Sequence, residues 1–276
     1  MVRNVVRRYP IWSFLFLNYL ISWSFLYPCY QMILENDALT PLALIGFIGG
    51  FGPTLAAIII QWIDDSAKVR PLLKRILRFK ASWIIVVSII LVPIILYSVS
   101  YFISISSFHG DMEFKLSGIS NSWKWVLLAL PFGPIMEELG WRGYMLPKLL
   151  KKNGVIKSTL LVGLAWGIWH MASFTFPGAA IPSFLPVNLW TIILFCLNTI
   201  GLSMIYTYVF FKTGGSVFYA ILLHAFFNSA ANITADMFGE TEQYSVLLSA
   251  YVINFVLAGI IGFVLIKNHE YKSNRV

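Results

Sequence analysis

The sequence predicts an all-α protein, a polytopic bundle of about eight transmembrane helices with both termini in the cytoplasm. Three observations predict it. Hydrophobic residues make up 58% of the 276 residues and charged residues only 12%, and the mean hydropathy is +0.76, values typical of a membrane protein rather than a soluble domain. The apolar residues gather in windows of about 20, long enough for a helix to cross a bilayer. The lysines and arginines fall in short runs between these windows.

Charges or Pro/Gly clusters bound each apolar window. In chain order, the predicted spans are 11–34, 42–63, 83–107, 122–150, 158–176, 187–211, 216–235 and 245–266. Pro134 is expected to kink the fourth span, because proline removes a helical hydrogen bond. The small residues 46–52 predict a close helix contact, and Ser216 predicts a helix start. No internal repeat or linker interrupts the pattern, so we expect one integral-membrane domain over residues 1–276.

The distribution of basic residues predicts the orientation. With the N-terminus in the cytoplasm, 17 of the 20 lysines and arginines fall on the inner side, and only Lys115 and Lys124 fall outside. Seven of the twelve acidic residues fall on the outer side. The positive-inside rule therefore predicts an N-in, C-in protein of the cell membrane in a prokaryote, or of the endoplasmic reticulum membrane in a eukaryote. The net charge of +8 reflects this orientation and does not indicate a nucleic-acid partner.

Three ionisable residues lie within the fourth span. Glu138 and Arg142 are four apart in the order that favours a helical ion pair. Glu137 points about 100° away from Glu138 around a helix and has no partner nearby in the sequence. A charge near the bilayer centre costs at least about 2.5 to 3.5 kcal/mol, so an unpaired intramembrane carboxylate indicates a functional site.

Two other predicted helices carry polar residues at a similar depth. At 1.5 Å per residue, Glu137 lies about 16 to 21 Å from the cytoplasmic face, His170 and Asn228 about 18 Å, and His224 about 12 Å. His224 and Asn228 are four apart and share one helix face. The sequence therefore predicts a site formed by these four residues and opening towards the cytoplasmic half of the membrane.

Two kinds of chemistry suit this set. A carboxylate and an imidazole, here Glu137 and His170, can deprotonate a water, while His224 and Asn228 stabilise the oxyanion formed when that water attacks an amide. Alternatively, Glu137, His170 and His224 could bind a divalent metal such as zinc. Both arrangements hydrolyse peptide bonds. We favour the metal-free mechanism with no cofactor, because asparagine is a poor zinc ligand and a good oxyanion donor.

Three ordered motifs on successive apolar segments are Glu137-Glu138-x-x-x-Arg142, Trp166-x-x-x-His170 and His224-x-x-x-Asn228. The set resembles the CAAX prenyl protease type II and bacteriocin-processing (CPBP or Abi) family of intramembrane proteases. The resemblance covers about residues 120–235, which would form the catalytic core. Trp166 stands where the family often has phenylalanine.

The resemblance implies roles for these residues. Glu137 and His170 would activate water, and His224 and Asn228 would form the oxyanion site. The remaining pair, Glu138 with Arg142, would brace the site or engage substrate. The substrate would be a membrane-associated peptide, either a prenylated C-terminal CAAX-type peptide or a bacteriocin or leader peptide.

Two functions from other classes of protein also fit these residues. Glu137 and the two histidines could relay protons in a transporter, although transporters tend to carry inverted repeats and paired broken helices, which this sequence lacks. The chain could also be a non-catalytic immunity or scaffold protein. The sequence does not indicate an oligomeric state.

Overall fold

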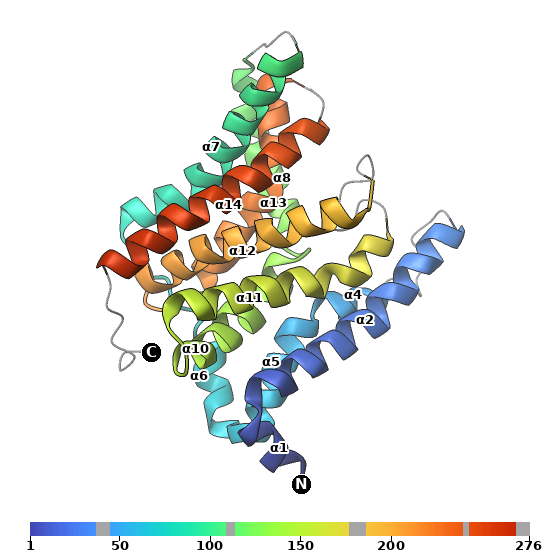
Figure 1. Ribbon diagram of the computed structural model, residues 1–276, viewed down its shortest axis with the longest axis vertical. Coiled ribbons are helices and arrows are strands. Elements are labelled where there is room, and N and C mark those ends of the chain that lie inside the picture. The colour runs from blue at the N-terminus through green and yellow to red at the C-terminus, as the bar shows by residue number, and fades with distance from the viewer. Residues whose placement is uncertain (37–44, 109–113, 177–185, 240–242, 269–276) are drawn as a thin grey trace.

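A computed structural model describes residues 1–36, 45–108, 114–176, 186–239 and 243–268. Over these residues the protein is helical, with no β-strand. Figure 1 shows most of the long helices running roughly side by side. In chain order the helices are α1 (Val2–Arg8), α2 (Pro10–Asn36), α4 (Phe47–Gly50), α5 (Gly52–Asp65), η1 (Ser66–Lys68), α6 (Val69–Leu73), α7 (Trp83–Phe108), α8 (Leu116–Ala129), α9 (Pro134–Glu138), η2 (Leu139–Met145), α10 (Leu146–Leu150), α11 (Val155–Trp169), η3 (His170–Thr175), α12 (Leu189–Lys212), α13 (Val217–Phe238) and α14 (Gln243–Asn268).

The all-helical prediction is confirmed over the described residues, and most predicted spans coincide with helices. Among the described residues, four helical stretches have the length and hydropathy of a membrane crossing, which supports an integral membrane protein. They are Trp83–Ile103, Val155–Thr175, Leu189–Lys212 and Val217–Phe238. The number of eight spans and the orientation of the termini stay predictions.

The fourth predicted span, 122–150, is wrong as a continuous helix. The chain leaves α8 at Leu130 and turns through Gly133, whose φ is 103°. Pro134 does not kink a helix interior, because it stands at the first position of α9. The first residue of a helix donates no hydrogen bond within the helix. Proline, which has no N–H, is therefore common at this position.

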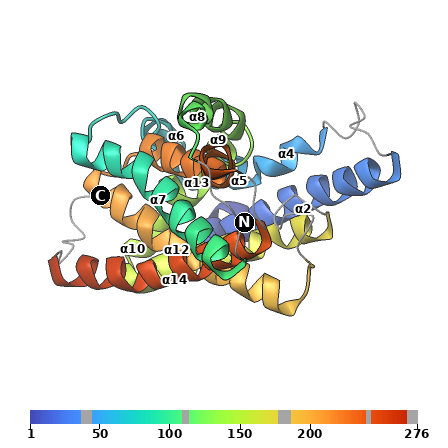
Figure 2. The ribbon, with the colours of Figure 1, turned by 90° about the horizontal axis from the view of Figure 1, so that it is seen from above.

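The helices pack in two groups that meet at α9 and η2. One group places α12 between α11 and α14 and packs α13 against α7 and α8, while the other packs α2 against α4 and α5. Seen from above, α2 and α4 extend together beyond the rest of the bundle (Figure 2). The short segments α9 and η2 contact both groups, since α5 and α13 each pack on them.

Glycines allow the close contact predicted for residues 46–52. A Cβ on Gly49 would lie 2.7 Å from the Leu26 side chain, and a Cβ on Gly52 would collide with the Ser22 hydroxyl. Both contacts lie between α2 and the α4–α5 region, so the absence of a side chain lets these backbones approach. The predicted helix start at Ser216 is also confirmed, because its hydroxyl accepts the Tyr219 N–H at 3.3 Å as the N-cap of α13.

Candidate active site

The break before α9 positions Glu137. A φ of 103° at Gly133 belongs to a region that residues with a side chain rarely adopt. The Glu137 N–H donates to the Gly133 carbonyl at 2.9 Å, so the first turn of α9 closes directly on the break. Glu137 therefore projects from the beginning of a short helix rather than from the middle of a long one.

Two indole N–H groups hold one oxygen of the Glu137 carboxylate. Trp166 Nε1 donates to Oε2 at 2.6 Å, and Trp141 Nε1 donates to the same oxygen at 3.3 Å. Glu137 is only 3% exposed, so these bonds replace the water that a surface carboxylate would have. Because both donors bind Oε2, the other oxygen, Oε1, is left to face the cavity described below.

Glu138 joins two other helical segments through its carboxylate. Arg142 Nη1 donates to Oε1 at 2.9 Å and to Oε2 at 3.1 Å, and His224 Nδ1 donates to Oε1 at 2.8 Å. The ion pair predicted from the spacing of Glu138 and Arg142 is therefore present. Both residues are 0% exposed, so neither charge is screened by solvent.

Two aromatic rings enclose the Arg142 guanidinium. Its Cζ lies 4.0 Å from the centroid of the Tyr206 ring and 4.4 Å from the centroid of the Trp166 ring. Both distances suit a cation–π interaction, which strengthens where water is excluded. Trp166 thus contacts the ion pair with its ring face and Glu137 with its N–H.

His170 begins η3 at the end of α11 and is held through one ring nitrogen. Its Nδ1 donates to the Trp166 carbonyl at 2.8 Å. A carbonyl oxygen only accepts, so Nδ1 carries the proton and the neutral ring presents Nε2 as an acceptor. His224 is also held through Nδ1, which donates to Glu138 Oε1, so that its Nε2 is not used in that bond.

Three of the predicted catalytic groups surround one point beside Gly133. A Cβ placed on Gly133 would lie 3.1 Å from Glu137 Oε1, 3.4 Å from Asn228 Nδ2 and 3.5 Å from His224 Nε2. One acceptor and two nitrogens therefore converge on a space that only a glycine at position 133 leaves open.

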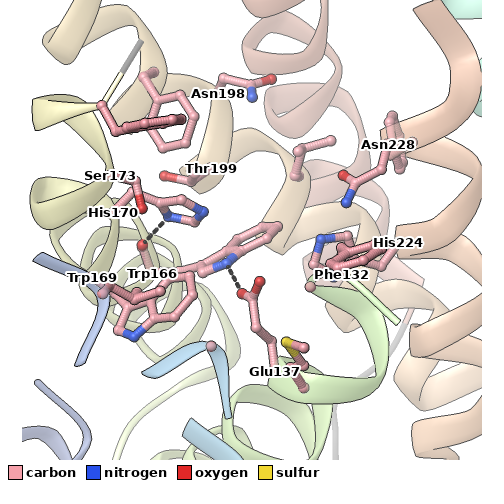
Figure 3. A pocket seen from close by; sticks show the side chains of 18 of the residues that line it. Phe132, Glu137, Trp166, Trp169, His170, Ser173, Asn198, Thr199, His224 and Asn228 are labelled. Atoms are coloured by element: carbon pink, nitrogen blue, oxygen red, sulfur yellow. Dashed lines mark hydrogen bonds between the residues drawn. The ribbon is translucent and has the colours of Figure 1, made fainter. Parts of the chain in front are cut away.

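This point lies in a cavity of about 620 Å³. The predicted residues Glu137, His170, His224 and Asn228 all line it, as Figure 3 shows. Its other lining residues are mostly apolar or aromatic and come from α2, α4, α7, α9, α11, η3, α12, α13 and α14 and from residues next to these helices. They include Leu26, Phe47, Tyr97, Phe132, Met136, Trp169, Phe176, Phe195, Leu202, Phe227 and Tyr251.

The sequence does not predict the structural roles of Trp166, Gly133 and Tyr206. In the sequence Trp166 stands out only as the aromatic residue four positions before His170, and this spacing does not predict its bond to Glu137. The Gly-Pro pair ahead of Glu137 was a usable signal for the break, since glycine and proline together often mark a turn. Tyr206 lies in an apolar span, and no local pattern distinguished it.

The predicted metal ligands do not form a ready metal site. Among the residues that the structure describes, no three His, Cys, Asp or Glu side chains are placed to hold a metal ion together. Glu137, His170 and His224 are thus brought to one cavity without being brought into one coordination sphere.

Known proteins are similar to this chain over the same segment. Residues 119–230 match the family described as Type II CAAX prenyl endopeptidase Rce1-like, which confirms the resemblance that the three motifs indicated. At family level this similarity supports a CAAX-type intramembrane protease.

The chain is also similar to a protein named CAAX prenyl protease 2 from Methanococcus maripaludis. The two are 28% identical over 134 residues, which are 49% of this chain and 48% of that protein. The chain thus matches about half the length of this relative.

Proposed function

We propose that this protein is an intramembrane endopeptidase that hydrolyses a peptide bond of a membrane-associated substrate. The observation that supports it best is the point beside Gly133, where Glu137 Oε1, Asn228 Nδ2 and His224 Nε2 lie 3.1, 3.4 and 3.5 Å from a common position. A water and a substrate carbonyl need such a set of one acceptor and two donors.

In this proposal the chain crosses the membrane eight times, with both termini in the cytoplasm.

The reaction follows from the hydrogen bonds of these groups. Glu137 Oε1 takes a proton from the attacking water, whose oxygen bonds to the carbonyl carbon, with His170 Nε2 as the second acceptor. The carbonyl oxygen becomes an oxyanion and accepts from Asn228 Nδ2 and from protonated His224 Nε2. The Glu138 carboxylate at His224 Nδ1 stabilises the charged imidazolium. Glu137 then returns its proton to the leaving amine nitrogen, and the C–N bond breaks.

Product sequencing tests this proposal. Purified protein is incubated with matched prenylated and unprenylated peptides and with leader peptides, and the fragments are sequenced by mass spectrometry. We expect cleavage at one defined bond in at least one class of peptide. The similarity to a relative named CAAX prenyl protease 2 makes the prenylated peptides the first to test. Intact peptides throughout the panel would favour the transporter or scaffold readings.

Gly133→Ala is expected to lower kcat by at least about 10-fold and to destabilise the fold by about 1 to 3 kcal/mol. The new methyl group would occupy the point between Glu137 and Asn228, and alanine would be held at a φ of 103°. Gly154→Ala is the matched control, because a Cβ there meets nothing within 4 Å. Steady-state rates and thermal unfolding of both variants test this, and wild-type kcat in Gly133→Ala would show that the reaction does not need the space beside Gly133.

We further propose that hydrolysis needs no metal, in line with the donor set around the cavity. Active protein treated with a chelator is then expected to keep its rate and to contain no stoichiometric zinc by elemental analysis. About one tightly held zinc per chain, with activity lost on its removal and restored on its return, would contradict the proposal.

A further inference from the structure

One face of α12 borders the candidate cavity and carries a carboxamide. Residues of α12 at spacings of three and four positions, which lie on one side of a helix, line the cavity. They are Phe195, Asn198, Thr199 and Leu202. Asn198 is only 6% exposed, and Figure 3 shows its side chain in the same space as His170. The carboxamide is therefore a buried polar group on the wall of the cavity.

The Asn198 carboxamide is held through its oxygen. Asn254 Nδ2 on α14 donates to Asn198 Oδ1 at 2.8 Å, and Asn254 is 1% exposed. Gly201 lets the two helices approach each other this closely, because a Cβ there would lie 2.6 Å from the Asn254 carbonyl oxygen. The bond uses the oxygen of Asn198 and leaves both N–H groups of its Nδ2 for another partner.

Within the described part of the chain, Asn198 Nδ2 donates no hydrogen bond. Other polar groups of the same lining differ in this respect. The Thr199 hydroxyl donates to the Cys196 carbonyl at 2.9 Å, and Trp169 Nε1 donates to the Ser22 hydroxyl at 2.6 Å. Buried N–H groups normally have a partner, so the unused Nδ2 in the cavity indicates a group that binds a ligand.

A peptide in this cavity would bring several carbonyl groups with it. The atoms that converge beside Gly133 serve only the carbonyl that is attacked. Each neighbouring carbonyl gives up its water on entering a lining that is mostly apolar, which is unfavourable unless the carbonyl finds a donor. Asn198 Nδ2 is a donor of this kind, and its own bond to Asn254 holds it in place.

We propose that Asn198 Nδ2 binds a main-chain carbonyl oxygen of the substrate, in a peptide group other than the one that is cleaved. This inference rests on the proposed function, because it takes the ligand of the cavity to be a peptide. A contact with the main chain is independent of the substrate side chains. It fixes which bond of the peptide lies beside Gly133, and Asn198 takes no part in proton transfer.

Two variants isolate the unused amide nitrogen. Asn254→Leu removes the bond between α12 and α14 and keeps the Asn198 carboxamide in the cavity. Asn198→Leu combined with Asn254→Leu removes the carboxamide as well. Replacing both partners of a hydrogen bond by apolar groups of similar shape is nearly neutral for stability, so the double variant should fold, and thermal midpoints in detergent check this.

The measurements are the Kd of a fluorescent prenylated CAAX-type peptide and of a fluorescent leader peptide, with kcat and KM where cleavage occurs. We expect Asn254→Leu to bind within about 3-fold of wild type and the double variant to bind about 10-fold more weakly, the effect of losing one hydrogen bond. Wild-type Kd in the double variant would overturn the proposal. An equal loss of affinity in both variants would also overturn it, because the amide pair would then act only through helix packing.

Peptides with a single thioamide locate the contact. Sulfur accepts a hydrogen bond more weakly than oxygen, so a thioamide at the bound carbonyl should weaken binding to the Asn254→Leu protein and leave binding to the double variant unchanged. Such non-additivity identifies two groups in direct contact. Additive effects of the thioamide at every position of the peptide would contradict the proposal.

Binding requires no turnover, so this inference and the protease proposal fail separately. A wild-type protein that binds peptide through Asn198 and cleaves none would contradict the protease proposal alone. A protein that cleaves peptide and keeps its Kd in the double variant would contradict the role of Asn198 alone.

Discussion

Glu137→Gln is expected to abolish peptide hydrolysis, lowering kcat by at least about 100-fold, because the amide cannot take a proton from water. The glutamine side chain should occupy the same position as the glutamate. Its carbonyl oxygen can accept the indole N–H groups that now bind Oε2, from Trp166 at 2.6 Å and Trp141 at 3.3 Å. The amide NH2 then faces the point beside Gly133, where a donor replaces the only acceptor of the three converging atoms.

The measurement is kcat on whichever peptide the wild-type protein cleaves, together with expression yield and the thermal midpoint in detergent. Glu35→Gln is the matched control, since Glu35 is an exposed carboxylate near the end of α2 and should tolerate the same change at wild-type rate. Appreciable turnover by Glu137→Gln would assign the base to another group, with His170 Nε2 the first candidate.

The helices were predictable because their signal is local. An apolar run of about 20 residues predicts a membrane helix whatever surrounds it. The break at 130–133 was not predicted, because hydropathy averages composition over a window and carries no information on φ. The window across Gly133 and Pro134 is as apolar as a continuous helix would be, and both residues are tolerated within membrane helices.

Within the site, the contacts that depend on helical spacing could be predicted. The four-residue spacing gave the pair Glu138–Arg142 and placed His224 and Asn228 on one face. The contacts between helices could not be read in this way. Trp166 reaches Glu137 across 29 positions of sequence, and such a contact depends on how α11 packs against η2 and α9 rather than on a local pattern.

The shape of the cavity also required the structure. Depth estimates along separate helices placed Glu137 and His224 near the same level and carry no information on the space around them. The residues of η2 are buried, with Arg142 stacked between aromatic rings. The cavity instead lies among residues of α2, α4, α12 and α13.

Arg142→Ala is expected to lower both folding yield and activity, with a loss of stability of about 3 to 5 kcal/mol. The change strands the Glu138 carboxylate, which is 0% exposed and would keep only the His224 bond at 2.8 Å. It also removes the guanidinium from between the Trp166 and Tyr206 rings. Trp166 holds Glu137 in place, and Glu138 holds His224. The change therefore loosens both of these site residues.

A double variant separates the stranded charge from the rest of the effect. In Arg142→Met with Glu138→Gln, no carboxylate is left without its cation, while the glutamine oxygen can still accept from His224 Nδ1. Replacing both members of a buried ion pair is far less costly than removing one, so yield and thermal midpoint should recover towards wild type. The rate should stay low, because a neutral glutamine stabilises the His224 imidazolium less than a carboxylate does. Wild-type yield and thermal midpoint in Arg142→Ala alone would show instead that Arg142 acts on the substrate and that Glu138 does not need its charge balanced there.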